Sequence, residues 1–399
     1  MEKPVAAIEF GSKKMKLVVG YELNGQVYTI YSLVRPYGHA IECADIVNAA
    51  SIAKVVEEIK SFVDQNMKMR IAVTEATLSL PPYGLQIFDN KQTTTVMAED
   101  RKVSGLDMKN IYTMIRNCSH SICNSLVDVV PESFILSDGR AFARLPSGET
   151  SFSLTVASKV HTLPKKTNDE FCGLLLNQGI KVKKTIVAPF AAMTLLSTYP
   201  EVPNDYILVD MGSNITTVSL IGNRQLYESR YFEWGGDSIT GKIIESFNIN
   251  ESDAEKYKIM YGIDNREMNF KAPVCITKDQ DGRDINHYNS DLNEIIKKEL
   301  DIFVKQLESA ISDLFITYDN DQSLKSLPLV LIGGASRLNG LVEYIEPKLI
   351  NKQIITVLPK TLGARNATFT NCLGMILASA RYQSEVEDSA PKVAQITRK

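Results

Sequence analysis

One short pattern occurs twice in this chain, and it constrains the fold more than any other feature. The pattern is an apolar strand, an acid-x-Gly-Ser turn and a second strand. It begins at Glu9 and again, 210 − 9 = 201 residues later, at Asp210. Apolar or β-branched runs flank both turns. A duplicated strand–turn–strand unit predicts two halves that are built on the same plan.

Both turns are suited to hold phosphate. A glycine in a tight turn lets backbone N–H groups approach phosphate oxygens without interference from a Cβ atom, and the serine hydroxyl adds a donor. The acids Glu9 and Asp210 can hold a hydrated Mg²⁺ ion, which prefers oxygen ligands and keeps its waters. Taken singly, each pattern is more typical of a plain hairpin turn; the duplication raises the phosphate-binding interpretation to an equal footing. The phosphate-binding residues predicted here are Gly11, Ser12, Lys13, Lys14, Gly212, Ser213 and Asn214.

Three later motifs complete a predicted nucleotide site. Gly235 and Gly236 precede a helical segment, whose N-terminal amides can meet phosphate. Glu255 and Lys258 lie three residues apart on one helix face, where they can bond ribose hydroxyls and the base edge, or only each other as a solvated ion pair. A strand that ends in another glycine pair allows the flat approach of a base or ribose. That strand end contributes Gly333, Gly334, Ser336 and Arg337.

Composition excludes several classes of protein. Lys+Arg is 44 and Asp+Glu is 47, a net charge of −3, which argues against a nucleic-acid partner. No apolar run approaches the roughly 18 residues that span a bilayer. The six cysteines and four histidines are scattered. Cys118, His120 and Cys123 lie close together but lack a fourth ligand, so no zinc site is predicted and a reduced, cytoplasmic compartment is expected.

Hydrophobic periodicity predicts alternating strands and helices. The chain opens with three antiparallel strands, at 5–10, 15–20 and 27–34, and Asn24-Gly25 suits the second turn between them. Further strands are predicted at 69–80, 92–96, 128–136, 141–145, 151–160, 182–187, 205–210, 216–233 and 327–332. Helices are predicted at 52–63, 106–127, 169–178, 189–197, 238–261, 292–316 and 371–383. Residues 263–291 are expected to be irregular.

The order of these motifs resembles the actin/Hsp70/sugar-kinase superfamily of ATPases. Residues 38–48, 127–136 and 252–258 are similar to segments of the FtsA family of bacterial cell-division proteins, the last two to its V-I-P-Q-x-Y strand and S-D-A-E-x-x-K helix. The resemblance covers about residues 4–383. It implies an α/β, actin-like fold of two RNase H-like halves around a nucleotide cleft. A small inserted α/β subdomain, the FtsA-type 1C, would replace actin subdomain 1B.

The resemblance also implies a division into subdomains. The first core subdomain (1A) would comprise residues 1–80, 164–199 and 358–388, and the inserted subdomain residues 81–163. The second core subdomain (2A) would comprise 200–236 and 313–357, and a small lobe (2B) residues 237–312. Residues 389–399 are expected to form a disordered tail.

By resemblance, the protein would bind ATP with Mg²⁺ and polymerise into protofilaments. It would bind the C-terminal tail of the tubulin-like protein FtsZ on the small lobe, where we place the contact at Asn289, Lys297 and Lys298. It would link the division ring to the cytoplasmic membrane and, through the inserted subdomain, to other divisome proteins. The expected location is cytoplasmic and peripheral, at the inner face of the membrane at the division site.

Four departures from the family pattern modify these expectations. Glu9 replaces the usual aspartate, and the turn after Asp210 lacks two glycines of the family's Asp-x-Gly-Gly-Gly-Thr. Residues 187–189 lack the acid or amide that orients water in many superfamily members. A general base contributes roughly 10²–10⁴-fold, so ATP hydrolysis should be slow or absent and ATP a structural ligand and switch. The tail has too little apolar surface for the family's membrane helix, so the chain is truncated or reaches the membrane through a partner.

Two alternatives remain open. A small-molecule kinase of the same fold would need a catalytic aspartate in a substrate pocket. Asp205 and Asp237 are the remaining acids, and their sequence context does not single them out. A scaffold of a pilus or secretion machine, like the PilM group, would share the fold and the nucleotide motifs. A peptide-binding assay would separate that scaffold from an FtsA-type protein.

Overall fold

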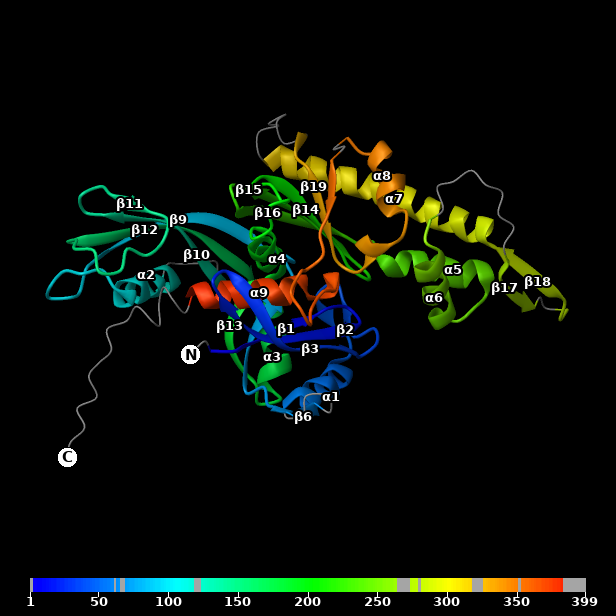
Figure 1. The fold of residues 1–399 in the computed structure, drawn as a ribbon, viewed down its shortest axis with the longest axis horizontal. Coiled ribbons are helices and arrows are strands. Elements are labelled where there is room, and N and C mark those ends of the chain that lie inside the picture. The colour runs from blue at the N-terminus through cyan, green and yellow to red at the C-terminus, as the bar shows by residue number, and fades with distance from the viewer. Residues whose placement is uncertain are drawn as a thin grey trace.

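Two five-stranded mixed sheets with the same strand order form the centre of the molecule (Figure 1). The computed structural model describes residues 3–60, 62–64, 69–117, 123–263, 273–278, 281–317, 326–350 and 353–382. The sheet orders are β13-β8-β1-β2-β3 and β16-β15-β14-β19-β20. Each central strand, β1 or β14, pairs antiparallel with the next strand in the chain and parallel with a later one. The repeat in the sequence is therefore a repeat of the fold.

The first sheet consists of β1 (Val5–Phe10), β2 (Lys14–Leu23), β3 (Gln26–Pro36), β8 (Glu75–Leu80) and β13 (Lys181–Val187). The second consists of β14 (Tyr206–Met211), β15 (Thr216–Gly222), β16 (Gln225–Phe232), β19 (Leu329–Ile332) and β20 (Ile354–Thr356). Two short ribbons accompany the first sheet: β4 (Ile41–Glu42) with β5 (Asp45–Ile46), and β6 (Phe62–Asp64) with β7 (Met69–Ile71).

The central strand β14 is apolar along its length because both of its faces are buried. Tyr206 and Leu208 join the core of the first half, whereas Ile207 and Val209 pack in the core of the second half. A strand covered on both faces reads as a continuous apolar run rather than an alternating one. This burial fixes the position of Asp210, which lies near the carboxyl end of the same strand.

The inserted module is an antiparallel sheet with one helix and a core of its own. Its elements are β9 (Gln86–Thr95), α2 (Gly105–Asn117), β10 (Asn124–Leu136), β11 (Ala141–Phe142) and β12 (Ser153–Pro164), in the sheet order β11-β10-β12-β9. The small lobe contains α5 (Gly236–Phe247), α6 (Glu251–Tyr261), the hairpin β17 (Pro273–Lys278) and β18 (Asp284–Tyr288), and α7 (Asn289–Thr317). The two lie at opposite ends of the long axis (Figure 1).

The remaining helices cover the two sheets. They are α1 (Ala49–Lys60), α3 (Lys165–Leu176), α4 (Ala188–Leu196), α8 (Leu341–Ile345) and α9 (Thr370–Tyr382). Short 3₁₀ turns occupy 335–337, 346–348 and 367–369. Although α9 follows the second sheet in the chain, it packs on α4, β1 and β2 of the first half. Its N-terminus consequently lies where the two halves meet.

The structure confirms most of the predicted elements and corrects several. The opening three strands are confirmed, and Asn24 and Gly25 both have positive φ, 54° and 79°. The helix predicted at 106–127 ends at Asn117, and Asn124 already belongs to β10, because its backbone pairs with β12. Met114 of this helix is 38% exposed. Cys118, His120 and the tail 389–399 lie outside the described residues.

Three further predictions of secondary structure were wrong in detail. Residues 69–80 form two strands rather than one, and 238–261 form two helices. The segment expected to be irregular, 263–291, contains the β17–β18 hairpin. Its alternation is hidden among polar residues, but His287 is buried and stacks on Phe247 at 4.2 Å between ring centroids. Tertiary packing thus stabilises strands that the local sequence does not predict. β20 and α8 were not predicted.

Candidate functional site

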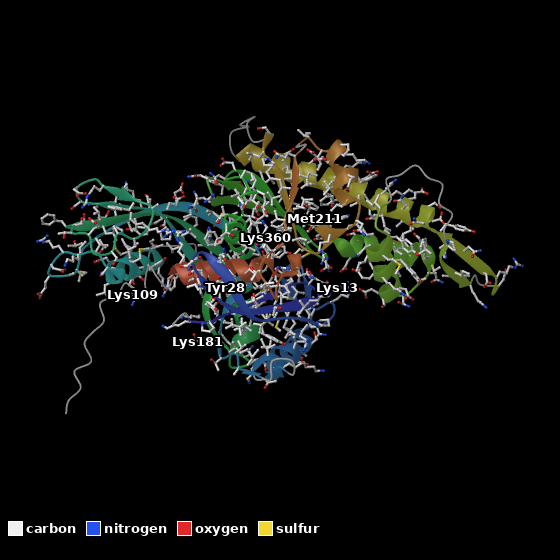
Figure 2. The ribbon with its side chains drawn as sticks, in the orientation of Figure 1. Lys13, Tyr28, Lys109, Lys181, Met211 and Lys360 are labelled. Carbon is white, nitrogen blue, oxygen red and sulfur yellow. The ribbon has the colours of Figure 1, made fainter. Side chains whose placement is uncertain are left out.

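The two repeated turns have the same backbone geometry. The N–H of Gly11 donates to the carbonyl of Lys14 at 3.0 Å, and the N–H of Gly212 donates to the carbonyl of Ile215 at 2.9 Å. The four residues are related by the same offset of 201. Each turn follows the carboxyl end of its central strand. Figure 2 labels Lys13 and Met211, which mark the two turns near the middle of the molecule.

The structure brings Glu9 and Asp210 together through a third residue. The side-chain nitrogen Nδ2 of Asn371, in the first turn of α9, lies 3.1 Å from Glu9 Oε1 and 3.4 Å from Asp210 Oδ2. Asn371 is 5% exposed. Sequence reasoning missed this residue. The available signal was an amide on a helix that is otherwise almost wholly apolar and buried.

A partly buried lysine lies beside the two acids. Lys16 stands opposite Glu9 in the β1–β2 register, and its Nζ is 2.9 Å from Glu9 Oε1. Burial alone would lower the pKa of Lys16, but the carboxylates of Glu9 and Asp210 outweigh burial and raise the pKa. The lysine therefore stays charged at the floor of the site. The sequence prediction also missed Lys16, although its place opposite Glu9 across a short turn was readable.

The electrostatic environment of Asp210 favours a cation. Burial, and then the charge of Glu9, raise the pKa of Asp210, whereas Lys16 and the hydrogen bond from Asn371 oppose that rise. Two carboxylates in a low-dielectric site are stabilised by any further positive charge nearby. A hydrated Mg²⁺ ion that arrives with a polyphosphate would supply such a charge.

The glycine pair before α5 allows a close approach to the second turn. A Cβ atom on Gly235 would lie 2.3 Å from the carbonyl oxygen of Ser213. The N–H groups of Gly236 and Asp237 donate to the carbonyls of Gly212 and Ser213, at 3.0 and 2.8 Å. The amides that sequence reasoning assigned to phosphate are thus already bonded within the protein. These hydrogen bonds attach the start of α5 to the turn at Gly212 and Ser213.

Lys13 and Lys14 differ sharply. The Nζ of Lys13 lies 2.7 Å from Asp237 and 2.6 Å from Glu251, two acids of the small lobe. Burial would lower the pKa of Lys13, but its hydrogen bonds to Asp237 and Glu251 outweigh burial and raise it. Lys14 is exposed. Of these two predicted phosphate ligands, one already pairs across the two halves.

The predicted adenosine residues form two groups. Lys258 Nζ, on α6, contacts the carbonyl of Gly236 at 3.0 Å, Thr240 Oγ1 at 2.8 Å and Glu255 Oε2 at 2.6 Å. These contacts match the three donors of an ammonium group, so Lys258 fastens α6 to α5 and leaves Glu255 as the exposed partner.

The second group surrounds the end of β19. Gly333 has φ +89°, and a Cβ there would lie 2.5 Å from Asp210 Oδ1. Only glycine adopts this conformation at so close an approach. A Cβ on Gly334 would meet no atom within 4 Å, which leaves the face of this turn open. Ser336 Oγ donates to the carbonyl of Gly333, and Arg337 is exposed beside it.

The donor set fits a magnesium nucleotide. Three acceptor oxygens, Glu9 Oε2, Asn214 Oδ1 and Asn371 Oδ1, are buried and have no hydrogen-bond partner among the described residues. Buried polar atoms normally have a hydrogen-bond partner, so these three unpaired acceptors on residues of the candidate site indicate a polar ligand. Oxygen donors of this kind suit Mg²⁺ and its waters.

Comparison with known proteins identifies relatives. The family model described as "Cell division protein FtsA" matches residues 207–374. FtsA of Streptococcus pneumoniae serotype 2 (strain D39) is 22% identical over 92% of this chain and 78% of its own length. FtsA of Enterococcus faecalis (strain V583) is 23% identical over 94% of this chain and 83% of its own. Over most of its length, this chain is similar to FtsA proteins.

Solved structures confirm the expected actin-like fold. A chain of the PilM–PilN type IV pilus biogenesis complex aligns with a TM-score of 0.60 at 17% identity. The alignment covers 95% of this chain and 99% of that chain. MreB 5 of Spiroplasma citri bound to AMPPNP has a TM-score of 0.55 at 10% identity, with coverage of 97% and 99%. At these identities the likeness concerns the fold alone.

The residues predicted to contact FtsZ lie on α7 of the small lobe. Asn289 begins that helix. Lys297 Nζ lies 5.8 Å from the ring centroid of Tyr344, and Lys298 pairs with Glu294 at 2.6 Å. Among the residues that the structure describes, no helix combines the length and apolar character needed to cross a bilayer.

Proposed function

We propose that this chain is an ATP-binding, polymer-forming cell-division protein that binds the C-terminal tail of FtsZ. It would link the division ring to the inner face of the cytoplasmic membrane and, through the inserted module, to other divisome proteins. The observation that carries the nucleotide part is the pair of equivalent turns whose acids, Glu9 and Asp210, meet at Asn371. The FtsA relatives support the cell-division part.

The chain's own residues divide the work of holding Mg-ATP. The turns at Gly11 and Gly212 would hold phosphate from the two halves, with Lys16 as the cation between them. Glu9 and Asp210 would hold the waters of Mg²⁺, which neutralises phosphate charge when bound. The open turn at Gly334 would lie against the adenosine. A ligand held from both halves favours their closed arrangement, so ATP would act as a switch for assembly.

Rapid hydrolysis is not part of this proposal. The position that carries a water-orienting acid or amide in many superfamily members is here the start of α4, Ala188 and Pro189. Neither side chain can accept a proton. We therefore expect ATP turnover well below about 1 s⁻¹, the lower end for working enzymes.

The deciding experiment measures binding of a fluorescent peptide with the sequence of the same organism's FtsZ C-terminal tail. We expect saturable micromolar binding by fluorescence anisotropy, and none with a scrambled peptide. Lys298→Glu should weaken binding by about two- to fivefold, the range for one exposed ion pair. Lys305→Glu, two turns further along α7 and also exposed, serves as the matched control. The absence of binding with and without ATP would refute the FtsZ-adaptor function.

A pilus-type scaffold is the second candidate, because the PilM–PilN complex covers nearly the whole chain with a TM-score of 0.60. The same peptide assay separates the two functions. The kinase alternative has no such support. Asp205 accepts a hydrogen bond from Asn223 at the end of β14 remote from the turn, and Asp237 pairs with Lys13.

A further inference from the structure

Asn371 joins the two halves at the acids. Its helix, α9, packs on α4 and the first sheet, whereas Asp210 belongs to the second sheet. One amide nitrogen nevertheless reaches oxygens of both Glu9, at 3.1 Å, and Asp210, at 3.4 Å. An amide nitrogen carries two hydrogens, so Asn371 can donate one to each acid. It thereby sets the spacing of two carboxylates that would otherwise repel each other.

An asparagine is better suited to this place than a residue of similar size. Leucine would give neither acid a hydrogen bond, and aspartate would add a third negative charge. The other end of the same amide is also informative. Asn371 Oδ1 is buried and has no partner among the described residues, and the same holds for Glu9 Oε2. Such unpaired acceptors cost stability, so their retention beside two acids indicates a ligand that donates hydrogen bonds.

We propose that Asn371 is a positioning residue for magnesium: it holds Glu9 and Asp210 at a fixed spacing, and its Oδ1 accepts a hydrogen bond from a water of the hydrated ion. This inference rests on the proposed nucleotide binding and adds a residue that the sequence motifs do not contain. Because Asn371 belongs to the first half and Asp210 to the second, the ion would be gripped only when the halves are together. Asn371 therefore links magnesium to the closed arrangement.

The test compares the affinity of a fluorescent ATP analogue, mant-ATP, for the full chain in Mg²⁺ and in EDTA. We define the magnesium ratio as Kd in EDTA divided by Kd in Mg²⁺. Asn371→Leu should lower this ratio about tenfold, the loss expected for one hydrogen bond to a charged group, with little change in EDTA. Asn371→Asp should raise the ratio, because its extra charge repels phosphate in EDTA and attracts Mg²⁺.

Opposite effects of the two variants distinguish positioning from a merely structural role. Ser379→Ala is the matched control: Ser379 is also buried on α9 and bonds Thr77 at 2.9 Å, but lies two turns away. It should leave the ratio unchanged, and thermal melting verifies that each variant is folded. Equal changes of Kd in both conditions would overturn the role of Asn371 alone. A wild-type ratio of one would overturn that role together with the magnesium part of the proposed function. A wild-type chain without mant-ATP binding would overturn the proposed function together with it.

Discussion

His161 is a buried histidine that carries no charge at neutral pH. It lies on β12, is 1% exposed and packs edge-on against Phe190 of α4, with ring centroids 5.3 Å apart. Burial, followed by the nearby charges of Lys159 and Lys184, lowers its pKa from 6.5 to about 3. The unfolded chain therefore binds a proton at this residue across a pH range in which the folded chain does not.

This difference predicts an acid-sensitive stability. A histidine with a depressed folded pKa destabilises the fold as pH falls below the unfolded value of 6.5, by about 1.4 kcal/mol per pH unit until about pH 3. Glutamine cannot bind this proton. In His161→Gln, the slope of unfolding free energy against pH should therefore fall by the equivalent of one proton between pH 6 and 4. Urea melts at several pH values measure that slope. An unchanged slope in the variant would show that His161 is protonated in the folded chain.

At this scale, the sequence identified part of the site. Glu9 and Asp210 were readable because each belongs to a local motif. Lys16 was overlooked although its register partner, Glu9, is only seven residues away. Asn371 could not be found in this way, because its partner Asp210 is 161 residues distant and the contact exists only after α9 returns to the first half. A local pattern carries no information about such a contact.

At the scale of elements, α4 and α9 cross in close backbone contact. A Cβ atom on Gly374 would lie 1.7 Å from the carbonyl oxygen of Ala191. At Gly374 the backbone of α9 therefore lies directly against the backbone of α4, with no room for a side chain. This approach determines the position of the N-terminus of α9 and, through it, of Asn371.

Gly374→Ala should therefore destabilise the fold although alanine is the better helix former. We expect a loss of about 1–3 kcal/mol, the usual cost of an inserted group in a packed core. Gly241→Ala on α5 is the control, because Gly241 is exposed and an added Cβ meets no atom within 4 Å. It should stabilise the chain by about 0.5–1 kcal/mol. Thermal melts compare the two; a stabilised Gly374→Ala would mean that the helices separate without cost.

Elements were predictable where their periodicity is local. The helix α7 was found because its apolar residues follow one regular period, and the strands β1, β2 and β14 because each is a short, largely apolar run. The β17–β18 hairpin was missed because its contacts with the core are non-local: His287 stacks on Phe247, and Val274 and Cys275 pack against the second core. The start of β10 was misassigned to a helix, since its pairing with β12 involves residues far along the chain.

At the scale of the whole molecule, polar contacts connect the two halves. Lys13 of the first half pairs with Asp237 and Glu251 of the small lobe, and Cys43 donates to Glu233 at 3.3 Å. The hydrogen bond from Lys13, followed by the charge of Lys13, lowers the pKa of Glu251. Glu251 is therefore ionised at neutral pH and pairs with the charged lysine. Separation of the two halves must break these contacts. Under the proposed nucleotide binding, Lys13 would therefore restrain nucleotide exchange whether or not it also touches phosphate.

Lys13→Gln should make mant-ATP dissociate about two- to fivefold faster, since partly exposed ion pairs are worth little each. Lys14→Gln, the exposed neighbour, should not change the rate. Glu251→Gln should act in the same direction but more weakly, because Lys13 keeps its pair with Asp237. The double variant should be no faster than Lys13→Gln alone, because Lys13 is a partner in both contacts. Stopped-flow displacement with excess ATP measures these rates. If Lys13 served only as a phosphate ligand, Glu251→Gln would leave dissociation unchanged or slow it, because the freed lysine would bind phosphate more tightly.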